Sequence, residues 1–480
     1  MEQIIVALDL GSSKLKVCVI QKNNGRLSLI HTETHLSEKA IRRGRVYNLD
    51  ETSDIISKLI RNLNNRLPSS VEKIYVGIGG QSLHTKLFCV KRLIEGENVV
   101  SQQLLDSIKD EALRYKPELD ENLGVFSEEY YVDGQLVFNP KGALASVIEA
   151  KFQLIVGNPC LKGNLKKVFG KKDIAVAGYF ISPIATAEAV LTQDEKDLGC
   201  ALVELGDEIT YVSVYKNKAL KYIVTIPLGG LAITKDIRSL NVSEEEAEVL
   251  KIKYGSAFSE SIDSREIAVN ETQNSPRKIE LRNMNWIIEA RVDEIVKNVW
   301  HQIHESGYSQ TLDAGIVITG GGALLRDLPL YIQNYTGKKV RLAKAKVWEN
   351  QSEIQLSPVF SCAVGLAIMG KENCVKEKNR KKPKFPFFSS KQQEQTPYLF
   401  EMDNEIIEEK NSEKEKRKEK SLPSSESQDT GGLKKLGKTV VNIIDKGADI
   451  FKEVDFNETA TPTKKESLLT YFEDEEIENY

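Results

Sequence analysis

The sequence predicts an α/β fold built from two similar lobes, and three features of the chain support this prediction. Strand-like apolar runs alternate with amphipathic helical segments up to about residue 370. A hairpin pattern at residues 4–8 and 17–20 encloses a glycine turn. A second hairpin pattern, at residues 211–215 and 220–226, follows a similar turn. We expect this repeat of hairpin, turn and helix from two lobes of common design.

Three glycine-centred turns each end a buried-strand pattern. The first reads Asp-Leu-Gly-Ser-Ser-Lys at residues 9–14, the second Glu-Leu-Gly-Asp-Glu at 204–208, and the third Thr-Gly-Gly-Gly-Ala at 319–323. A strand that ends in Asp-x-Gly-Ser lets backbone N–H groups and hydroxyls face a phosphate chain, while the acid holds Mg²⁺ through water. One such turn is as often only a tight turn. The order and spacing of the three together predict a nucleotide clamp.

Further blocks of sequence indicate a particular protein family. They lie, in chain order, at residues 43–46, 76–80, 131–134, 185–196, 226–230 and 245–255. Over about residues 1–370 the chain resembles the FtsA family of bacterial cell-division proteins, within the actin/Hsp70 superfamily. The resemblance implies an actin-like fold of two ribonuclease-H-like domains with an FtsA-type inserted subdomain, followed by a disordered linker and a C-terminal amphipathic helix.

The resemblance and the composition together suggest domain boundaries. We expect a first lobe at residues 1–82, 161–195 and 358–372, an inserted subdomain at 83–160, a second lobe at 196–357 with a partner-binding subdomain at about 236–306, a linker at 373–430, an amphipathic helix at 431–456 and an acidic tail at 457–480. Apolar spacing predicts helices at residues 52–63, 101–115 and 282–306, and a strand at 152–156.

In the family that the chain resembles, ATP and Mg²⁺ lie between the two lobes. Carried over by position, the cofactor-binding residues are Asp9 (Mg²⁺ through water), Gly11, Ser12, Ser13 and Lys14 (phosphates), Gly206 (second turn), Gly320, Gly321, Gly322 and Ala323 (adenosine), and Glu248 and Lys251 (ribose and adenine). Glu248 and Lys251 lie three residues apart on one helix face, so an exposed ion pair is the alternative interpretation.

Two departures from the family pattern affect the expected chemistry. The second turn of the family reads Asp-x-Gly-Gly-Gly-Thr-Thr, whereas Asp207 and Glu208 replace two of its glycines here. Their charge would repel a triphosphate at close range. Ser182, before Pro183, stands where actin-like relatives often place a Glu or Gln that orients the attacking water. Because phosphoryl transfer depends on positioning and charge neutralisation, we predict weak or no ATP hydrolysis and assign no catalytic residue.

Composition excludes several classes of protein. A formal net charge of −4 over 480 residues is no signature of a nucleic-acid-binding protein. Six cysteines without a Cys-x-x-Cys pair favour a reducing compartment over a zinc site or a disulfide framework. A strand-like run follows Met1-Glu2 directly, and no stretch of about 18 apolar residues occurs, so we expect neither a signal peptide nor a membrane span. These features predict a cytoplasmic protein.

The chain near its C-terminus carries one apolar stripe at helical spacing. The stripe consists of Leu433, Leu436, Val440, Ile444, Phe451 and Val454. Lysines flank it, and charged residues within the segment forbid spanning a bilayer. A helix of this kind on a disordered linker is typical of an interfacial membrane anchor. The alternative is a helix that docks on a partner or back on the folded body.

The leading functional hypothesis is a scaffold that resembles FtsA. It would bind ATP, self-associate into actin-like protofilaments and tether the tubulin-like protein FtsZ to anionic lipid at the division septum, on the cytoplasmic side of the inner membrane, for later division proteins to join. The resemblance makes Arg291 and Glu294 candidates for contact with the FtsZ C-terminal tail, with an intrahelical ion pair as the alternative. Rival hypotheses are an ATP-dependent kinase or chaperone of the superfamily and a PilM-like assembly scaffold.

Overall fold

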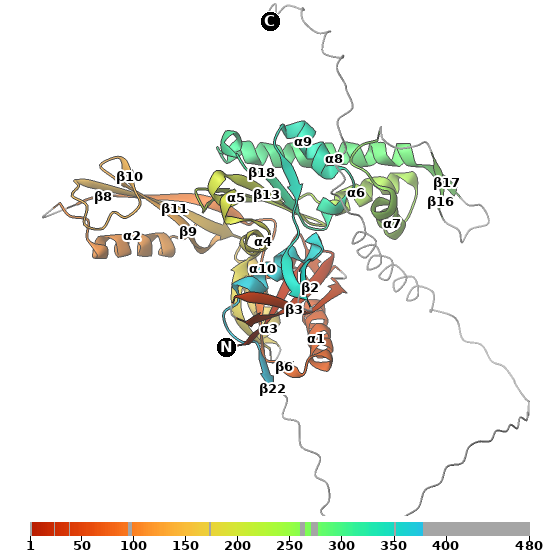
Figure 1. Cartoon of the computed structure of the whole chain (residues 1–480), viewed down its shortest axis with the longest axis horizontal. Coiled ribbons are helices and arrows are strands. Elements are labelled where there is room, and N and C mark those ends of the chain that lie inside the picture. Colours follow the sequence, from red (N-terminus) through yellow and green to blue (C-terminus); the bar gives the residue numbers. More distant parts are fainter. Residues whose placement is uncertain are drawn as a thin grey trace, which may run out of the picture.

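The computed structural model describes residues 2–377, apart from residues 24, 38, 95–97, 172–173, 260–264, 270–276 and 350–351. The expected amphipathic helix at 431–456, with its membrane-binding residues, and the acidic tail lie outside the described residues, as does the expected linker beyond residue 377. The described chain forms two lobes, one above the other in Figure 1, and an insert that projects to the side. This is the predicted α/β architecture.

The first lobe is built on a seven-stranded sheet with the order β12-β7-β1-β2-β3-β20-β21. Its strands are β1 (Gln3–Leu10), β2 (Lys14–Asn23), β3 (Arg26–Leu36), β7 (Lys73–Ile78), β12 (Ala175–Ile181), β20 (Lys346–Glu349) and β21 (Ser352–Gln355). The predicted first hairpin is β1–β2, which are antiparallel, whereas β7 joins β1 in parallel. Strands β20 and β21 extend this sheet beyond β3, although their residues fall within the expected range of the second lobe.

The second lobe repeats the same topology in a five-stranded sheet. Its order is β15-β14-β13-β18-β19, with β13 (Cys200–Leu205), β14 (Thr210–Lys216), β15 (Ala219–Ile226), β18 (Gly315–Thr319) and β19 (Val340–Leu342). In each sheet three strands form an antiparallel meander, and two later strands add in parallel beside the first. The two lobes are therefore copies of one design, as the sequence repeat predicts.

Helices cover the first sheet and connect the lobes. They are α1 (Leu49–Arg66), α3 (Cys160–Gly170), α4 (Ser182–Val190) and α10 (Ser361–Met369). The side chain of Asn48 caps α1 by accepting from the N–H groups of Asp50 and Glu51, which starts this helix earlier than the expected residue 52. Helix α4 contacts strands of both sheets and crosses α10 closely. The first lobe also includes β22 (Val375–Glu377), which pairs with β6 (Ser69–Val71). This strand lies beyond residue 372, the expected end of the lobe.

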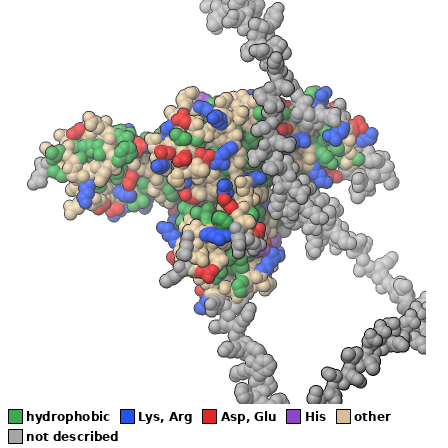
Figure 2. Space-filling model, viewed as in Figure 1, with side chains coloured by type: hydrophobic (Ala, Val, Ile, Leu, Met, Phe, Trp, Pro, Cys, Tyr) green, Lys and Arg blue, Asp and Glu red, His purple; other side chains and the backbone are tan. Residues whose placement is uncertain are grey.

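The insert is a separate four-stranded antiparallel sheet with one helix. Its order is β10-β9-β11-β8, with β8 (His84–Leu93), β9 (Glu121–Val132), β10 (Gln135–Val137), β11 (Val147–Gly157) and α2 (Gln102–Arg114). The core of the insert includes Phe152 and Leu154 on β11 and Ile108 on α2, all buried. Hydrophobic side chains also gather on the surface at its far end, where Phe138 and Leu144 are exposed (Figure 2).

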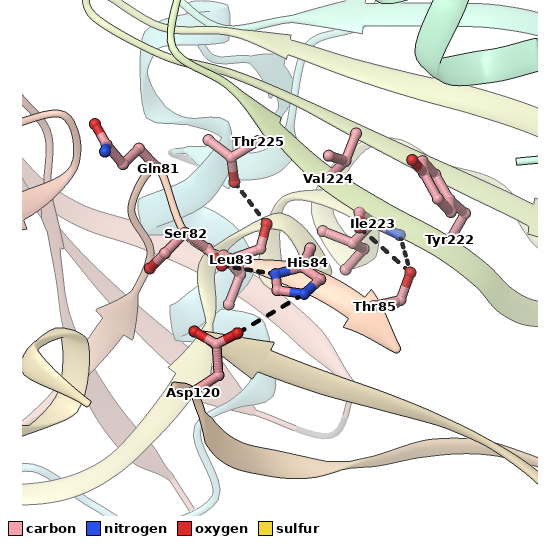
Figure 3. A pocket seen from close by; sticks show the side chains of 10 residues that line it. All are labelled: Gln81, Ser82, Leu83, His84, Thr85, Asp120, Tyr222, Ile223, Val224 and Thr225. Carbon is pink, nitrogen blue, oxygen red and sulfur yellow. Dashed lines mark hydrogen bonds and ion pairs between the residues drawn. The ribbon is translucent and has the colours of Figure 1, made fainter. Parts of the chain in front are cut away.

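The insert packs against β15, the edge strand of the second sheet. Thr85 Oγ1 accepts from the N–H of Ile223 at 3.1 Å, and Lys221 Nζ forms an ion pair of 2.5 Å with Glu129. Beside these contacts lies a cavity of about 400 Å³ (Figure 3), in which His84 and Asp120 of the insert face β15. Direct bonds therefore tie the insert to the second lobe.

The remaining helices of the second lobe carry much of the expected site. They are α5 (Gln193–Leu198), α6 (Gly230–Ile237), α7 (Glu244–Tyr254), α8 (Leu281–Glu305) and α9 (Leu328–Thr336), beside a small hairpin of β16 (Glu266–Val269) and β17 (Arg277–Glu280). Ser243 and Glu246 form a capping box that fixes the start of α7. Within the described part of the chain, no helix is both long enough and apolar enough to cross a bilayer.

Candidate functional site

The first glycine turn joins β1 to β2. The N–H of Gly11 donates to the carbonyl of Lys14 at 3.1 Å, and a Cβ atom at Gly11 would lie 2.7 Å from that same oxygen. Glycine is therefore required at this position. Ser13 at the tip is exposed, whereas the hydroxyl of Ser12 accepts from the N–H of Gly44 at 3.0 Å.

The second turn, between β13 and β14, has the same backbone. The N–H of Gly206 donates to the carbonyl of Ile209 at 2.9 Å, and a Cβ atom at Gly206 would lie 2.7 Å from that oxygen. Gly206 is thus the counterpart of Gly11. The side chains differ, because the two residues after Gly206 are the acids Asp207 and Glu208 where the first turn has serines. Burial raises the pKa of Asp207 to about 6.

Asp9 and Glu204 bring two carboxylates together between the lobes. Lys16, opposite Asp9 in the β1–β2 register, forms an ion pair of 2.6 Å with it. Burial opposes the charge of the Lys16 ammonium, but Asp9 raises its pKa above the ordinary value. Burial, helped by the Asp9 charge, raises the pKa of Glu204 to about 7. Glu204 also accepts from the hydroxyl of Thr186 at 2.8 Å.

Lys16 is a functional candidate that the sequence interpretation missed. Its side chain is largely buried beside Asp9, so it places a cation at the acid expected to hold Mg²⁺. The signal was present in the sequence: residues opposite each other in a two-stranded hairpin share one face, and the alternation of β2 puts Lys16 on the face of Asp9.

The third turn lies against the second. Gly320 has a φ of 90°, and a Cβ atom there would lie 2.4 Å from the carbonyl oxygen of Leu205, next to Gly206. After Gly320 the chain forms a short 3₁₀ turn, Gly322–Leu324, that includes Ala323, and it reaches α9 only later. The chain therefore does not pass directly from β18 into a helix, because α9 starts only at Leu328, after Asp327.

Helix α7 brings Glu248 and Lys251 to the same place. Their side chains form an ion pair of 2.7 Å that is only partly exposed. Lys251 Nζ also donates to the carbonyl of Gly230 at 3.0 Å, and the N–H of Gly230 donates to the carbonyl of Gly206. The pair therefore lies beside the second and third turns, where the resemblance places the nucleoside.

Three backbone N–H groups of the first lobe donate hydrogen bonds in the region between the turns. The Glu208 carboxylate of the second lobe accepts from the N–H of Arg43. The hydroxyl of Tyr211, also of the second lobe, accepts from the N–H of Gly80 at 2.6 Å. The third bond is that from Gly44 to Ser12. These amides are already hydrogen-bonded to protein oxygens.

Ser182 begins α4 at the bottom of this region. It is buried, and its Oγ lies within 2.6 Å of where a Cβ atom of Gly77 would be. Its carbonyl accepts from the hydroxyl of Thr186 at 3.1 Å. A serine is too short to replace the Glu or Gln that orients water in actin-like relatives, so this position does not supply such a group.

Arg291 and Glu294 lie on α8, away from the three turns. Arg291 forms a bidentate pair with Asp236 of α6, with Nε–Oδ2 at 2.5 Å and Nη2–Oδ1 at 3.1 Å, and it also bonds Glu294. The Asp236 hydrogen bond raises the pKa of Arg291. The intrahelical pair is therefore present, and an interhelical pair accompanies it.

Comparison with known proteins gives consistent results. The family described as Cell division protein FtsA matches residues 201–365. Proteins named Cell division protein FtsA from Porphyromonas gingivalis and Pseudomonas aeruginosa are 29% and 27% identical, over 78% and 77% of this chain and 80% and 89% of their own lengths. The Bacillus subtilis protein of that name is 29% identical over 71% of this chain and 78% of its own. The chain is therefore similar to FtsA cell-division proteins over most of its length.

A solved structure supports the fold of this chain. The PilM-PilN type IV pilus biogenesis complex has a chain with a TM-score of 0.54 and 15% sequence identity, covering 76% of this chain and 97% of that chain. At this identity the similarity concerns the actin-like fold alone.

The residues of this chain fit part of a nucleotide with Mg²⁺. Asp9 and Lys16 supply an acid and a cation, and α7 supplies a polar pair beside the glycine turns. The second turn fits a terminal phosphate poorly, because carboxylates replace its glycines.

Proposed function

We propose that this protein is a cell-division scaffold that holds an adenine nucleotide and Mg²⁺ between its lobes, assembles into protofilaments and tethers FtsZ to the inner face of the cytoplasmic membrane. The observation that carries the nucleotide role is the convergence of the three glycine turns and α7 on one place. The similarity to FtsA cell-division proteins supports the division role.

The nucleotide would act as a structural ligand in this proposal. Asp9 would hold Mg²⁺ through water, Gly11, Ser12, Ser13 and Lys14 would face the phosphates, and the third turn with Glu248 and Lys251 would bind the adenosine. Hydrolysis would be weak or absent, because Ser182 provides no water-orienting group and acids crowd the second turn. A kinase or chaperone activity has no supporting motif beyond the shared fold.

The proposed FtsZ contact uses Arg291. An acidic tail peptide would compete with Asp236 and Glu294 for the guanidinium, whose bidentate geometry suits a carboxylate. Since Arg291 remains partly exposed, with 26% of its side chain accessible, a peptide can reach it without unfolding α8.

The proposed membrane contact uses the apolar stripe that includes Phe451 and Val454. The test is co-sedimentation of the full-length protein with anionic vesicles, with and without FtsZ polymer. We expect the protein to bring FtsZ to the vesicles, and we expect a Phe451→Asp, Val454→Asp double variant to lose vesicle binding.

Arg291→Ala is the second arm of this experiment. It should lose FtsZ recruitment yet keep vesicle binding. If the full-length protein left FtsZ in the supernatant while itself binding vesicles, the tethering function would be excluded. If the Asp double variant still bound vesicles, the stripe would not be the anchor.

A further inference from the structure

The amide groups at the meeting point of the lobes bear on which nucleotide the site accepts. If a nucleotide binds as the resemblance implies, its adenosine would lie by Gly320 and α7, and its phosphates would lie at the first and second turns. The last phosphate would then be the one farthest from the adenosine. Its oxygens need backbone N–H donors and cations.

Two backbone donors of the first lobe that face the second lobe are already occupied. Arg43 donates its N–H to Glu208, and Gly80 donates its N–H to Tyr211. Both acceptors come from the second lobe, and both donors come from the first. Tyr211 occupies the position opposite Glu204 that Lys16 occupies opposite Asp9, so the second hairpin supplies a neutral hydroxyl where the first supplies a cation.

A glycine of the first lobe leaves room for the Tyr211 side chain. A Cβ atom at Gly79 would lie 2.3 Å from the tyrosine oxygen, so this side chain fills space that any larger residue would need. The tyrosine ring is buried. It therefore forms a fixed part of the wall of the site rather than a mobile surface group.

The charges around the site also disfavour a third phosphate. Glu208 and Asp207 present carboxylates from the second turn, and Glu248 adds a third at α7. Lys251 is paired with Glu248, and Lys16 is paired with Asp9. A terminal phosphate would bring further negative charge toward these carboxylates, and a diphosphate lacks that charge.

We propose that this site is specific for a nucleoside diphosphate, with the Glu208 carboxylate standing in the place of the terminal phosphate. This inference rests on the proposed nucleotide site and narrows its ligand. Glu208 and Tyr211 are then specificity-determining residues, and the lobes close through protein oxygens without a third phosphate.

Isothermal titration of the full-length protein with MgADP and with MgATP tests the proposal. We expect MgADP to bind about 10-fold more tightly than MgATP, because the triphosphate must displace or face a carboxylate. Glu208→Gly should reduce this ratio to about 2 or less, since it removes the carboxylate and returns a glycine to the turn. Thermal melting of each protein without nucleotide establishes that it is folded.

Two further variants keep the test decisive. Glu208→Gln removes the charge while retaining the shape, so it should lower the ratio even if glycine disturbs the turn. Glu245→Gln removes an exposed acid of α7 instead and should keep the wild-type ratio. If wild type bound MgATP as tightly as MgADP, or if Glu208→Gln left the ratio unchanged, the diphosphate specificity would be overturned. The proposed nucleotide role would still stand. If neither nucleotide bound, the proposed nucleotide role would fail as well.

Discussion

At the scale of single residues, one backbone turn occurs twice with opposite side-chain chemistry. The N–H groups of Gly11 and Gly206 each donate to the carbonyl of the residue three positions later, so the turn geometry is common to both lobes. Lys16 and Tyr211 then occupy equivalent positions, one charged and one neutral. The backbone alone therefore does not make a phosphate site, because the side chains decide what charge the turn tolerates.

Gly320 gives a prediction at this scale. Gly320→Ala should lower the free energy of unfolding by about 1–3 kcal/mol, because alanine is strained at a φ of 90° and its Cβ would press on the Leu205 carbonyl. Gly134→Ala is the matched control, since Gly134 has a φ of 85° and nothing within 4 Å of its Cβ position. Urea unfolding measures both. Equal losses in the two variants would show that backbone strain, and not the contact with Leu205, requires Gly320.

At the scale of elements, the crossing of α4 and α10 is the closest contact between helices of the first lobe. A Cβ atom at Gly365 would lie 1.7 Å from the carbonyl oxygen of Ala185. The helix axes can approach this closely only because position 365 has no side chain. Since α4 also contacts β13, the crossing lies next to the second lobe.

Gly365→Ala is the prediction that follows. It should force the two helices apart and destabilise the fold by about 1–3 kcal/mol or more. Gly163→Ala, in the middle of α3 with no atom near its Cβ position, should instead stabilise by about 0.4–1 kcal/mol through the unfolded chain. Thermal and urea unfolding give both values. A neutral Gly365→Ala would mean that the crossing relaxes without cost.

At the scale of the whole molecule, a small number of polar contacts sets how the insert sits on the second lobe. Thr85 bonds both the N–H and the carbonyl of Ile223, and Thr225 donates to the carbonyl of Leu83 at the start of the insert. The ion pair of Glu129 with Lys221 adds a charge contact, and only 9% of the lysine side chain is exposed. These contacts link the insert to a lobe that is distant in sequence.

The Glu129 pair predicts a pH dependence. Its hydrogen bond with Lys221 lowers the pKa of Glu129 below the ordinary value, so the pair contributes stability above about pH 4.5 that is lost as the pH falls through the lowered folded-state pKa. Glu129→Gln should therefore cost up to about 1 kcal/mol at pH 7, and the difference from wild type should shrink below pH 4. Urea unfolding from pH 7 to below pH 4 measures this difference.

Glu149→Gln is the control for that prediction. Glu149 is similarly exposed and pairs with Lys151 inside the insert sheet, so it does not reach the second lobe. Amide hydrogen exchange at Ile223 should rise in Glu129→Gln and stay unchanged in Glu149→Gln. Exchange that rises equally in both variants would contradict a role of Glu129 in holding the insert in place.

Much of the architecture follows from the sequence alone. Apolar periodicity and glycine turns predict the two hairpins, the long α8 and the repeated lobe, because burial on one face leaves a period that can be counted. The placement of β20 and β21 in the first sheet was not predictable, since a strand pairing between Trp348 and Ser28 leaves no local trace. The start of α9 depended on Asp327 in a left-handed conformation.

The candidate site was likewise predictable from the sequence only in part. The sequence by itself determined which residues form the three turns, because only glycine tolerates the close backbone approaches at Gly11, Gly206 and Gly320. Only the tertiary structure decided that Glu208 and Tyr211 reach across to Arg43 and Gly80, and that Lys16 neutralises Asp9. Local sequence sets backbone geometry, whereas a contact between two lobes depends on how the whole chain brings distant segments together.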